Sequence, residues 1–319
     1  MIRAIVIGPT EHTKLCLEEI LKTEGFKVEA VFGSDLSWKH RKARWTTFDD
    51  LSDRYGFQVV YCRRLRDSEN IELIRKINPD VIFEFGSSEI IPKEILDIPK
   101  LGTIGSHGGP LPDVKGGASL NWALLRDEKR WGVSLYYLIE GVDEGDIIAV
   151  EYFGIDDRDN IKTLHDKSDY YTVKMLRCSL KDLNEEGNTT RIKQNRGTSI
   201  ILPQRKPKDS EINWGSSSRQ IFNLVRASTH PFFGAFTYLN NRVVYIWKAS
   251  YVLVNNIDKS NEINGSIYNL DDKKGFYVKC SDGHLLIERV GFQDEAEMWA
   301  DEFYKINGLK MGDLLGSNN

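Results

Sequence analysis

Hydrophobic and polar positions divide the first part of the chain into short apolar runs and amphipathic stretches. The apolar runs have strand length and are rich in Val, Ile and Phe; they cover residues 3–8, 27–33, 57–62 and 80–86. Between them, residues 12–25 and 70–80 place apolar side chains at helical spacing, and Gly25 and Pro79 mark their ends. Strands that alternate with helices predict a parallel sheet covered on both faces.

The second part of the chain changes character. Residues 131–155 predict two strands joined by a turn rich in Gly and Asp, and residues 161–187 predict a long amphipathic helix. A polar, proline-containing connector is expected over 195–214, and a further helix over 216–229. Short β-rich runs follow, which predict a small barrel or sandwich: 235–249, 264–270, 275–280 and 284–290. Residues 293–303 predict a terminal helix that packs Met298, Trp299 and Phe303.

We therefore expect an α/β protein with two domains. A Rossmann-like parallel-sheet domain is expected in residues 1–204, including a linker from about residue 190, and a small β-rich domain in residues 205–319. The composition is that of a globular protein, with 40% hydrophobic and 28% charged residues. A net charge of -4 argues against a surface built to grip nucleic acid.

Localisation follows from what the sequence lacks. No apolar run approaches the ~20 residues of a membrane span, and residues 1–14 do not have the layout of a signal peptide. The four cysteines lie far apart without a CxxC pair, which favours reduced thiols over disulfides or zinc ligands. These features predict a cytoplasmic protein that binds no membrane and no metal.

One loop carries most of the candidate chemistry. Residues 102–125 hold a single histidine, His107, with glycines on both sides, prolines after it and few charges. In a parallel α/β sheet, ligands bind outside the carboxyl ends of the strands, which is where this loop is expected. A loop histidine that is satisfied by the backbone and has no function is the alternative.

An acidic, glycine-containing turn follows downstream. It contains Glu140, Asp143, Glu144 and Asp146. Carboxylates in such a turn are usually solvated. If one of them meets His107, it can orient the imidazole and stabilise its charged form.

Three separated motifs point to one family. "SEIIP" has Ser88 where the family has Gly, "GSHGGPLPDVKG" contains His107, and "DEGDI" begins at Asp143. In this order they resemble the catalytic domain of the folate-dependent formyltransferases. Residues 212–236 are similar to the start of that family's C-terminal, OB-like barrel. Within the family, "SLNWALLRDE" and "FNLVRA" most resemble the sugar-nucleotide N-formyltransferases.

The resemblance implies a formyl donor, 10-formyltetrahydrofolate, and no metal. His107 and Asp143 match two of the family's three catalytic positions. His107 would accept the proton of the attacking amine or stabilise the oxyanion, and Asp143 would hold it in place. A pterin slot is expected between residues 85–92 and 139–146, with these contacts: Phe85, Gly86, Ser87, Ile90, Ile91, Glu140, Gly141 and Asp146.

The chain departs from the family pattern beside His107. Gly105 stands where the family has its third catalytic residue, an Asn whose N–H faces the developing oxyanion; such a donor is worth ~3 kcal/mol. Ser106 should point to the opposite side, so a backbone N–H of the loop or protonated His107 is the expected substitute. A non-catalytic relative that only binds folate or sugar nucleotide is the alternative.

The acceptor is expected to be an amino sugar linked to a nucleotide. A 4-amino-4,6-dideoxyhexose on UDP or dTDP is favoured, as in surface glycan synthesis. The alternative, methionyl-tRNA, needs a basic surface, and residues 205–319 hold 14 basic and 14 acidic residues. A purine precursor or water as acceptor ranks lower. Candidate substrate contacts are Trp38, Lys39, Arg41, Gly109 and Lys115, with core packing as the alternative for the tryptophan. A homodimer is expected by analogy alone.

Overall fold

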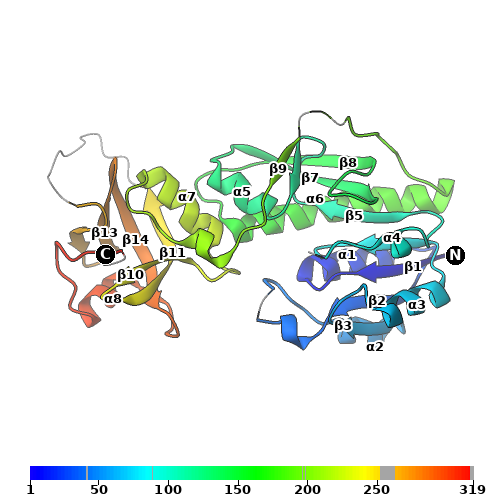
Figure 1. Cartoon of the computed structure of the whole chain (residues 1–319), viewed down its shortest axis with the longest axis horizontal. Coiled ribbons are helices and arrows are strands. Elements are labelled where there is room, and N and C mark those ends of the chain that lie inside the picture. Colours follow the sequence, from blue (N-terminus) through cyan, green and yellow to red (C-terminus); the bar gives the residue numbers. More distant parts are fainter. Residues whose placement is uncertain (41, 88, 196, 198, 252–262, 317–319) are drawn as a thin grey trace. The chain divides into compact units, whose positions relative to one another are not determined.

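The computed structural model describes residues 1–40, 42–87, 89–195, 197, 199–251 and 263–316, which form two compact units (Figure 1). The first unit comprises Met1–Ser119, Arg130–Gly154 and His165–Gln204. The second comprises Leu120–Lys129, Ile155–Leu164 and Arg205–Asn319. The domain boundary between residues 204 and 205 stays a prediction.

A seven-stranded sheet forms the centre of the first unit (Figure 1). Its order is β3-β2-β1-β4-β5-β7-β8, and its strands are β1 (Ile2–Ile7), β2 (Phe26–Ser34), β3 (Gln58–Cys62), β4 (Val81–Glu84), β5 (Thr103–His107), β7 (Arg130–Leu138) and β8 (Ile147–Gly154). The five strands from β3 to β5 are parallel, whereas β7 and β8 are antiparallel to their neighbours. The predicted α/β, Rossmann-like class is thereby confirmed.

Helices cover both faces of this sheet. The elements are α1 (Glu11–Lys22), η1 (Leu36–Trp38), α2 (Asp49–Tyr55), α3 (Ser68–Ile77), α4 (Lys93–Leu96), α5 (Ser119–Leu125), which belongs mainly to the second unit, and α6 (Ile161–Glu186). Ile74 of α3 and Ile95 of α4 pack in one buried cluster with Ile5, Ile7 and Ile82 of the sheet. The opposite face is covered by α1 and α6. Because side chains alternate along a strand, each strand sends consecutive residues to these two different layers.

A close backbone approach places the end of β1 beside the end of β4. Gly8 has φ 146°, and a Cβ added to it would lie 2.0 Å from the carbonyl oxygen of Phe85. Only glycine fits such a position without a backbone shift. Strands β1 and β4 mark the switch point of the strand order, where ligands of open α/β sheets bind.

The polar connector contains a strand that the sequence did not predict. Strand β9 (Ile200–Leu202) pairs in parallel with β6 (Val114–Gly116), which lies just after the His107 loop. The connector expected over 195–214 thus contains a short strand that the sequence analysis did not name. The pairing partner lies far away in sequence, so local pattern could not reveal it.

The second unit is built on an antiparallel sheet. Its strands are β10 (Ala235–Leu239), β11 (Arg242–Tyr251), β12 (Ile267–Asp271), β13 (Gly275–Cys280), β14 (Gly283–Phe292) and β15 (Met298–Trp299), and its other elements after residue 205 are η2 (Pro207–Ser210), α7 (Ser218–Ser228) and α8 (Ala300–Ile306). The order is β10-β11-β14-β13-β12, with β15 on β14. The predicted β-rich second domain is confirmed.

The C-terminal helix is shorter than predicted. Helix α8 begins at Ala300, whereas Met298 and Trp299 pair with β14 as a strand. Phe303 is buried as expected, but Trp299 is 50% exposed. Alternating strand geometry turns one of two neighbouring side chains outward, which explains the difference.

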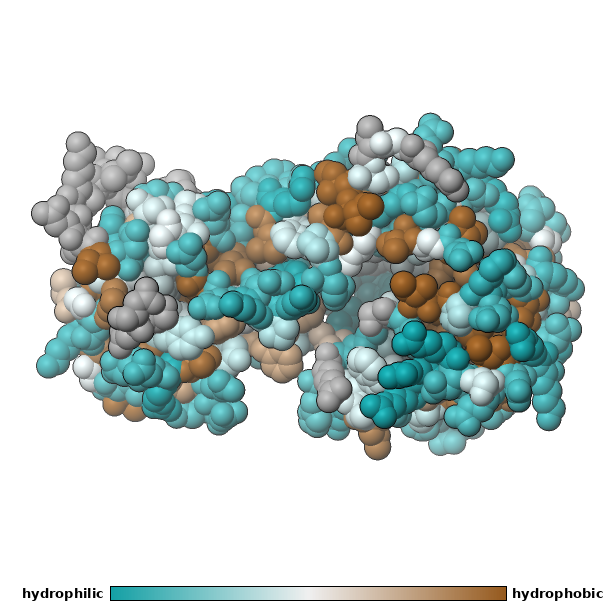
Figure 2. Space-filling view, viewed as in Figure 1, coloured by the Kyte–Doolittle hydropathy of each residue, from teal (hydrophilic) through white to brown (hydrophobic). Residues whose placement is uncertain are grey.

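The surface is mixed in polarity. In the view of Figure 2, hydrophobic residues lie in separated groups among hydrophilic ones. Within the described parts of the chain, no helix combines the length and apolar character that a membrane span requires. All four cysteines are free thiols.

Candidate active site

His107 ends strand β5 and lies almost entirely buried, with 7% of its side chain exposed. Its Nδ1 lies 3.5 Å from Oδ2 of Asp143, and the imidazole forms a hydrogen bond with the backbone of Val114. The other ring nitrogen, Nε2, is buried and has no hydrogen-bond partner among the described residues. The structure thus brings together the two residues that the sequence named as catalytic.

The surroundings of His107 favour a neutral ring. Burial lowers its pKa below the ordinary value, and the charge of Asp143 and the bond to Val114 oppose only part of this shift. A carbonyl partner at Nδ1 keeps the proton on that nitrogen, which leaves the lone pair of Nε2 available. His107 is therefore suited to accept a proton near neutral pH. Protonated His107, expected as one substitute for the missing Asn, does not fit these surroundings.

Asp143 is fixed by its turn. Its φ of 54° lies in the left-handed region, which Asp and Asn tolerate better than most residues. Its Oδ2 accepts the backbone N–H of Gly116 at 2.8 Å, and its Oδ1 accepts the hydroxyl of Tyr136 at 2.8 Å. The side-chain amide of Gln194 donates to the Asp143 carbonyl at 2.8 Å. The carboxylate consequently holds one orientation toward His107.

A second buried carboxyl lies beside this pair, and the sequence analysis did not single it out. Glu84, the last residue of β4, is 7% exposed, and its Oε1 accepts the backbone N–H of Ser87 at 2.7 Å. Burial is the main cause that raises its pKa to about 7; Asp143 adds to the rise, and Ser87 and Lys42 oppose it. The signal available in the sequence was an acidic residue in the interior of the apolar run 80–86, which Asp80 begins.

The first predicted pterin loop follows directly from Glu84. Phe85 is fully buried and stacks on Phe83 with ring centroids 6.2 Å apart, so its side chain serves the core. Gly86 has φ 71°, and Ser87 is held by Glu84. Ile91 is also buried in a core cluster. Among these predicted contacts the backbone groups, rather than the side chains of Phe85 and Ile91, are placed to meet a ligand.

One member of this loop is exposed. The side chain of Ile90 has 75% of its surface accessible, which is unusual for isoleucine. Ser88, part of the quoted motif, lies outside the described residues. Ile90 is thus the apolar side chain of the loop that is free to pack on a flat ring.

Glu140 of the second predicted loop acts electrostatically on Lys93, which begins α4 directly after the first loop. The side-chain bond to Asp97 is the main cause that raises the pKa of Lys93, and the charge of Glu140 adds to the rise. Glu140 and Gly141 are exposed, and Gly141 has φ 114°. The carbonyl of Asp146 accepts the Tyr137 N–H at 2.9 Å. The role of both loops in folate binding stays a prediction.

The predicted substrate contacts are spread over three places. Trp38 lines a narrow cleft of about 40 Å³ at the carboxyl ends of the parallel strands, and Lys39 beside it is exposed. Lys115 is 3% exposed, and its Nζ pairs with Glu144 at 2.9 Å. Arg41 lies outside the described residues. These contacts stay predictions.

Gly109 leaves room for His107. A Cβ at Gly109 would lie 2.7 Å from Nε2 of His107, closer than real contacts allow. Any side chain at this position would therefore displace the imidazole as it stands here. Gly109 shapes the site by the absence of a side chain.

The narrow cleft has two basic residues that the sequence analysis did not name as contacts. Lys42 and Arg63 line it together with Trp38 and Ser87. Burial lowers the pKa of Lys42 to about 8, while the charges of Glu84 and Glu89 oppose this shift. Arg63 follows β3 directly, so its position after a parallel strand was the available signal.

Ser106 carries a polar network on the other face of β5. Its hydroxyl lies 2.8 Å from Nε2 of His12, whose Nδ1 lies 2.7 Å from Oδ1 of Asp169 on α6. The guanidinium of Arg44 pairs with Asp169 at 2.5 Å. Ser106 thus points away from His107, as expected, and its partners anchor the strand that ends in His107.

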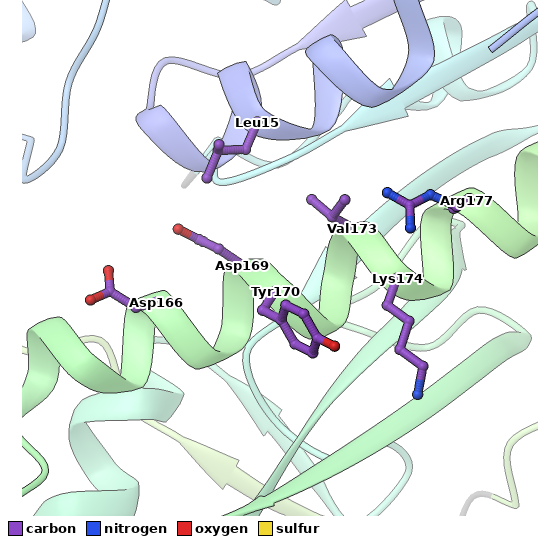
Figure 3. A pocket seen from close by; sticks show the side chains of 7 residues that line it. All are labelled: Leu15, Asp166, Asp169, Tyr170, Val173, Lys174 and Arg177. Atoms are coloured by element: carbon purple, nitrogen blue, oxygen red, sulfur yellow. The ribbon is translucent and has the colours of Figure 1, made fainter. Parts of the chain in front are cut away.

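The same network borders a larger pocket. A cavity of about 370 Å³ lies between α1 and α6, and its lining includes Leu15, Asp169, Val173 and Arg177. In Figure 3, Leu15 of α1 points toward α6. This pocket belongs to the α1 and α6 layer, the face of the sheet opposite His107.

Asp169 makes this network a source of stability that depends on pH. Burial alone would raise the pKa of Asp169, but bonds and charges from His12 and Arg44 outweigh it and lower the pKa to about 2. An unfolded Asp titrates near 4. The folded state therefore gains roughly 2–3 kcal/mol above pH 4, and this gain disappears as the pH falls from about 4 to about 2.

We predict that Asp169→Asn lowers the free energy of unfolding at pH 7 by about 3 kcal/mol, because Arg44 loses its buried charge partner. Urea unfolding at pH 7 and pH 3 measures this, and the gap between variant and wild type should shrink at pH 3. Glu185→Gln, an exposed change on the same helix, serves as the control. An equal gap at both pH values would contradict the assigned pairing.

No group of three or more His, Cys, Asp or Glu side chains that could hold a metal occurs among the described residues. The ionisable side chains that the structure gathers at the site are His107, Asp143 and Glu84.

Comparison with known families decides the identity. The family model described as formyl transferase matches residues 4–177, and the formyl transferase C-terminal domain matches residues 205–308. The chain belongs to the formyl transferase family. The enzyme class expected from the three motifs is thereby confirmed.

Relatives of this formyltransferase differ in the acceptor their names give. A methionyl-tRNA formyltransferase from Clostridioides difficile is 31% identical over 316 residues, covering 98% of this chain and 100% of the relative. An N-formyltransferase from Helicobacter canadensis, solved with folinic acid and dTDP-3-aminofucose, has a TM-score of 0.63 at 21% identity, covering 90% of this chain and 98% of its own.

A third similar structure is longer than this formyltransferase. HypX from Aquifex aeolicus in complex with tetrahydrofolic acid has a TM-score of 0.62 at 17% identity and is matched over 94% of this chain and 46% of its own. The chain spans about half the length of HypX. At these identities, both solved structures support the fold.

Proposed function

We propose that this chain transfers a formyl group from 10-formyltetrahydrofolate to the amine of a nucleotide-linked amino-dideoxy sugar, with a 4-amino-4,6-dideoxyhexose on UDP or dTDP favoured. The observation that carries the proposal is the buried imidazole of His107, which lies beside Asp143 in a formyltransferase domain and whose Nε2 has no hydrogen-bond partner among the described residues. A cytoplasmic location, suited to four free thiols, belongs to the same proposal.

The residues at the site fit a formyl folate. The donor would supply a formyl carbon that an amine can attack. Nε2 of His107 is a buried polar atom that has no hydrogen-bond partner within the described part of the chain, and the two predicted loops have exposed groups such as Ile90 and Gly141. The Helicobacter canadensis relative, which was solved with folinic acid, supports a folate ligand for this fold.

His107 acts on the attacking amine. The bond between the amine nitrogen and the formyl carbon forms while Nε2 of His107 takes the amine proton. The bond between the formyl carbon and the donor nitrogen then breaks, and the proton on Nε2 passes to that nitrogen. Asp143 stabilises the transiently charged imidazole from the Nδ1 side, where it lies 3.5 Å away.

The charge pattern supports a small anionic acceptor. On the sheet of the second unit, Arg242 pairs with Glu295 at 2.6 Å and Arg289 pairs with Glu297 at 2.6 Å. Cations that are neutralised in this way contribute little to phosphate binding. In the first unit, Lys42 and Arg63 line one cleft together with Trp38, a set suited to a diphosphate and a base.

Methionyl-tRNA is the second candidate acceptor. The observation that favours it is the relative from Clostridioides difficile, which carries that name and matches the chain over nearly its full length. That similarity extends through the second unit, where a tRNA would need basic surface.

An acceptor panel separates the two candidates. The protein is incubated with 10-formyltetrahydrofolate and UDP- or dTDP-linked 4-amino-4,6-dideoxyhexoses, their 3-amino isomers, or methionyl-tRNA. We expect tetrahydrofolate release and a formylated product with an amino-sugar nucleotide. Formylation of methionyl-tRNA alone would contradict the sugar proposal. Folate binding in calorimetry without turnover on any amine would indicate a binding protein, and sedimentation of the same sample tests the homodimer.

A further inference from the structure

Strand β4 ends in a carboxyl group that faces the reacting centre. Glu84 is paired in register with Gly105 of β5, and Gly105 with Tyr136 of β7. Residues in register share a face of the sheet, and His107, two positions after Gly105, lies on the same face. Glu84 therefore belongs to the layer that contains His107 and the hydroxyl that binds Asp143.

The carboxyl of Glu84 borders the place of the missing Asn. A Cβ built on Gly105 would lie 3.2 Å from Oε2 of Glu84 and 2.3 Å from Cδ1 of Leu138. The space that an Asn side chain would enter is thus already taken by these two side chains. Oε1 of Glu84 is fixed by the Ser87 N–H at 2.7 Å, which leaves Oε2 as the oxygen on the Gly105 side.

The groups around Glu84 favour its neutral form. Burial is the largest cause that raises the pKa of Glu84, and the carboxylate of Asp143 raises it further. The Ser87 N–H and the charge of Lys42, from the loop after β2, lower it. Burial and the charge of Asp143 raise the pKa of Tyr136 on β7, and the charge of Glu84 adds to this rise. With a pKa of about 7, the carboxyl is protonated in about half of the molecules at neutral pH. A protonated carboxyl is an O–H donor, whereas a carboxylate only accepts.

We propose that Glu84 is a catalytic residue, whose protonated carboxyl donates its O–H to the formyl oxygen and so replaces the side-chain amide absent at Gly105. This inference rests on the formyl transfer proposed above. Glu84 shares its proton with the oxygen as negative charge develops there and keeps it when the charge is lost. The proton of the amine travels separately through His107.

Kinetics of four variants test the donor role. Glu84→Ala should lower kcat by about 10²–10³-fold, since one donor to the developing charge is lost. Glu84→Gln retains an N–H donor and should stay within about tenfold of wild type. Glu84→Ala combined with Leu138→Ala and Gly105→Asn should regain most of the loss, because the amide then enters the space that both side chains vacate. Gly105→Asn alone should be impaired, since Glu84 and Leu138 oppose it.

The pH profile distinguishes a proton donor from a structural group. Wild-type kcat should fall above pH 7 as Glu84 ionises, by up to about tenfold per pH unit. Glu84→Gln should lack this fall. Glu29→Gln on β2, a partly buried carboxylate paired with Arg3, is the matched control and should keep the wild-type profile. A profile of Glu84→Gln that still falls as in wild type would overturn the proposal.

Ligand binding gives a readout that needs no acceptor. Calorimetry with a non-oxidising 10-formyl dideazafolate analogue should show weaker binding at pH 8 than at pH 6 for wild type, by up to about tenfold per pH unit, and no such change for Glu84→Gln. Equal pH dependence in both proteins would overturn the role of Glu84. If the analogue binds as expected while no amine is formylated, the proposed function fails and the contact between Glu84 and the formyl group stands.

Discussion

Replacing His107 by Asn should lower kcat for formyl transfer by about 10³-fold or more. Burial lowers the pKa of the imidazole, its Nδ1 lies 3.5 Å from Asp143, and its Nε2 has no partner among the described residues. An amide at this position cannot take the proton of the amine, so the main acid-base step is lost. Single-turnover release of tetrahydrofolate measures the effect.

Folding should survive this change, because Asn fills part of the same polar space and the strand keeps its backbone bonds. Thermal unfolding of the variant provides that check. His230→Asn in the second unit, where the histidine binds Glu297 at 2.9 Å, is the matched control and should leave kcat unchanged. Full activity of the His107 variant would remove this residue from the mechanism.

The second large effect is expected for Asp143→Asn, which should lower kcat by about 10²–10³-fold. Asn tolerates the left-handed φ of 54° at this position, so the turn is retained. The negative charge beside the imidazole is lost, and with it the stabilisation of the proton that His107 accepts. The charge of Asp143 raises the pKa of His107, so the variant should lower that pKa further.

A pH–rate profile tests the same pair directly. Activity that needs neutral His107 declines on the acid side, and this acid limb should move to lower pH in Asp143→Asn. The sign follows from the loss of a charge that favours the protonated ring. An acid limb at the wild-type position would show that Asp143 does not act through His107, even if kcat falls.

The hydrophobic pattern of the sequence was sufficient to predict those elements of the first unit that bury one face against the core. The apolar runs and the spacing of Leu17 and Ile20 place strands and helix α1 because each buries one face. The sequence analysis did not predict strand β9 or the strand at Met298, because both form by pairing with strands elsewhere in the sequence. Hydrophobic periodicity indicates which side chains are buried. Whether a short segment flanked by polar residues forms a strand depends on the partner strand that the whole fold places beside it.

The sequence also predicted some residues of the candidate site and not others. The motif order was enough to predict that His107 and Asp143 meet, because both lie in loops at one edge of the sheet. The sequence analysis did not identify Glu84 as a site residue, because an acidic residue inside an apolar strand gives no indication of which residues lie beside it. Only the register between β4 and β5 shows that this carboxyl lies beside Gly105. Sequence spacing alone does not give neighbours across strands.

Strand β5 sends His107 to one layer and Ser106 to the other, where His12 and Asp169 hold it. We therefore expect substitutions in the layer under α6 to change the rate of formyl transfer, although these residues contact neither substrate. In a family tree, we expect residues 12, 106 and 169 to change as a set, since the loss of His12 removes the partner of the Ser106 hydroxyl and leaves Arg44 as the partner of Asp169, which loosens the strand that carries the proton acceptor. We therefore expect variants in this layer to lose heat tolerance and turnover together.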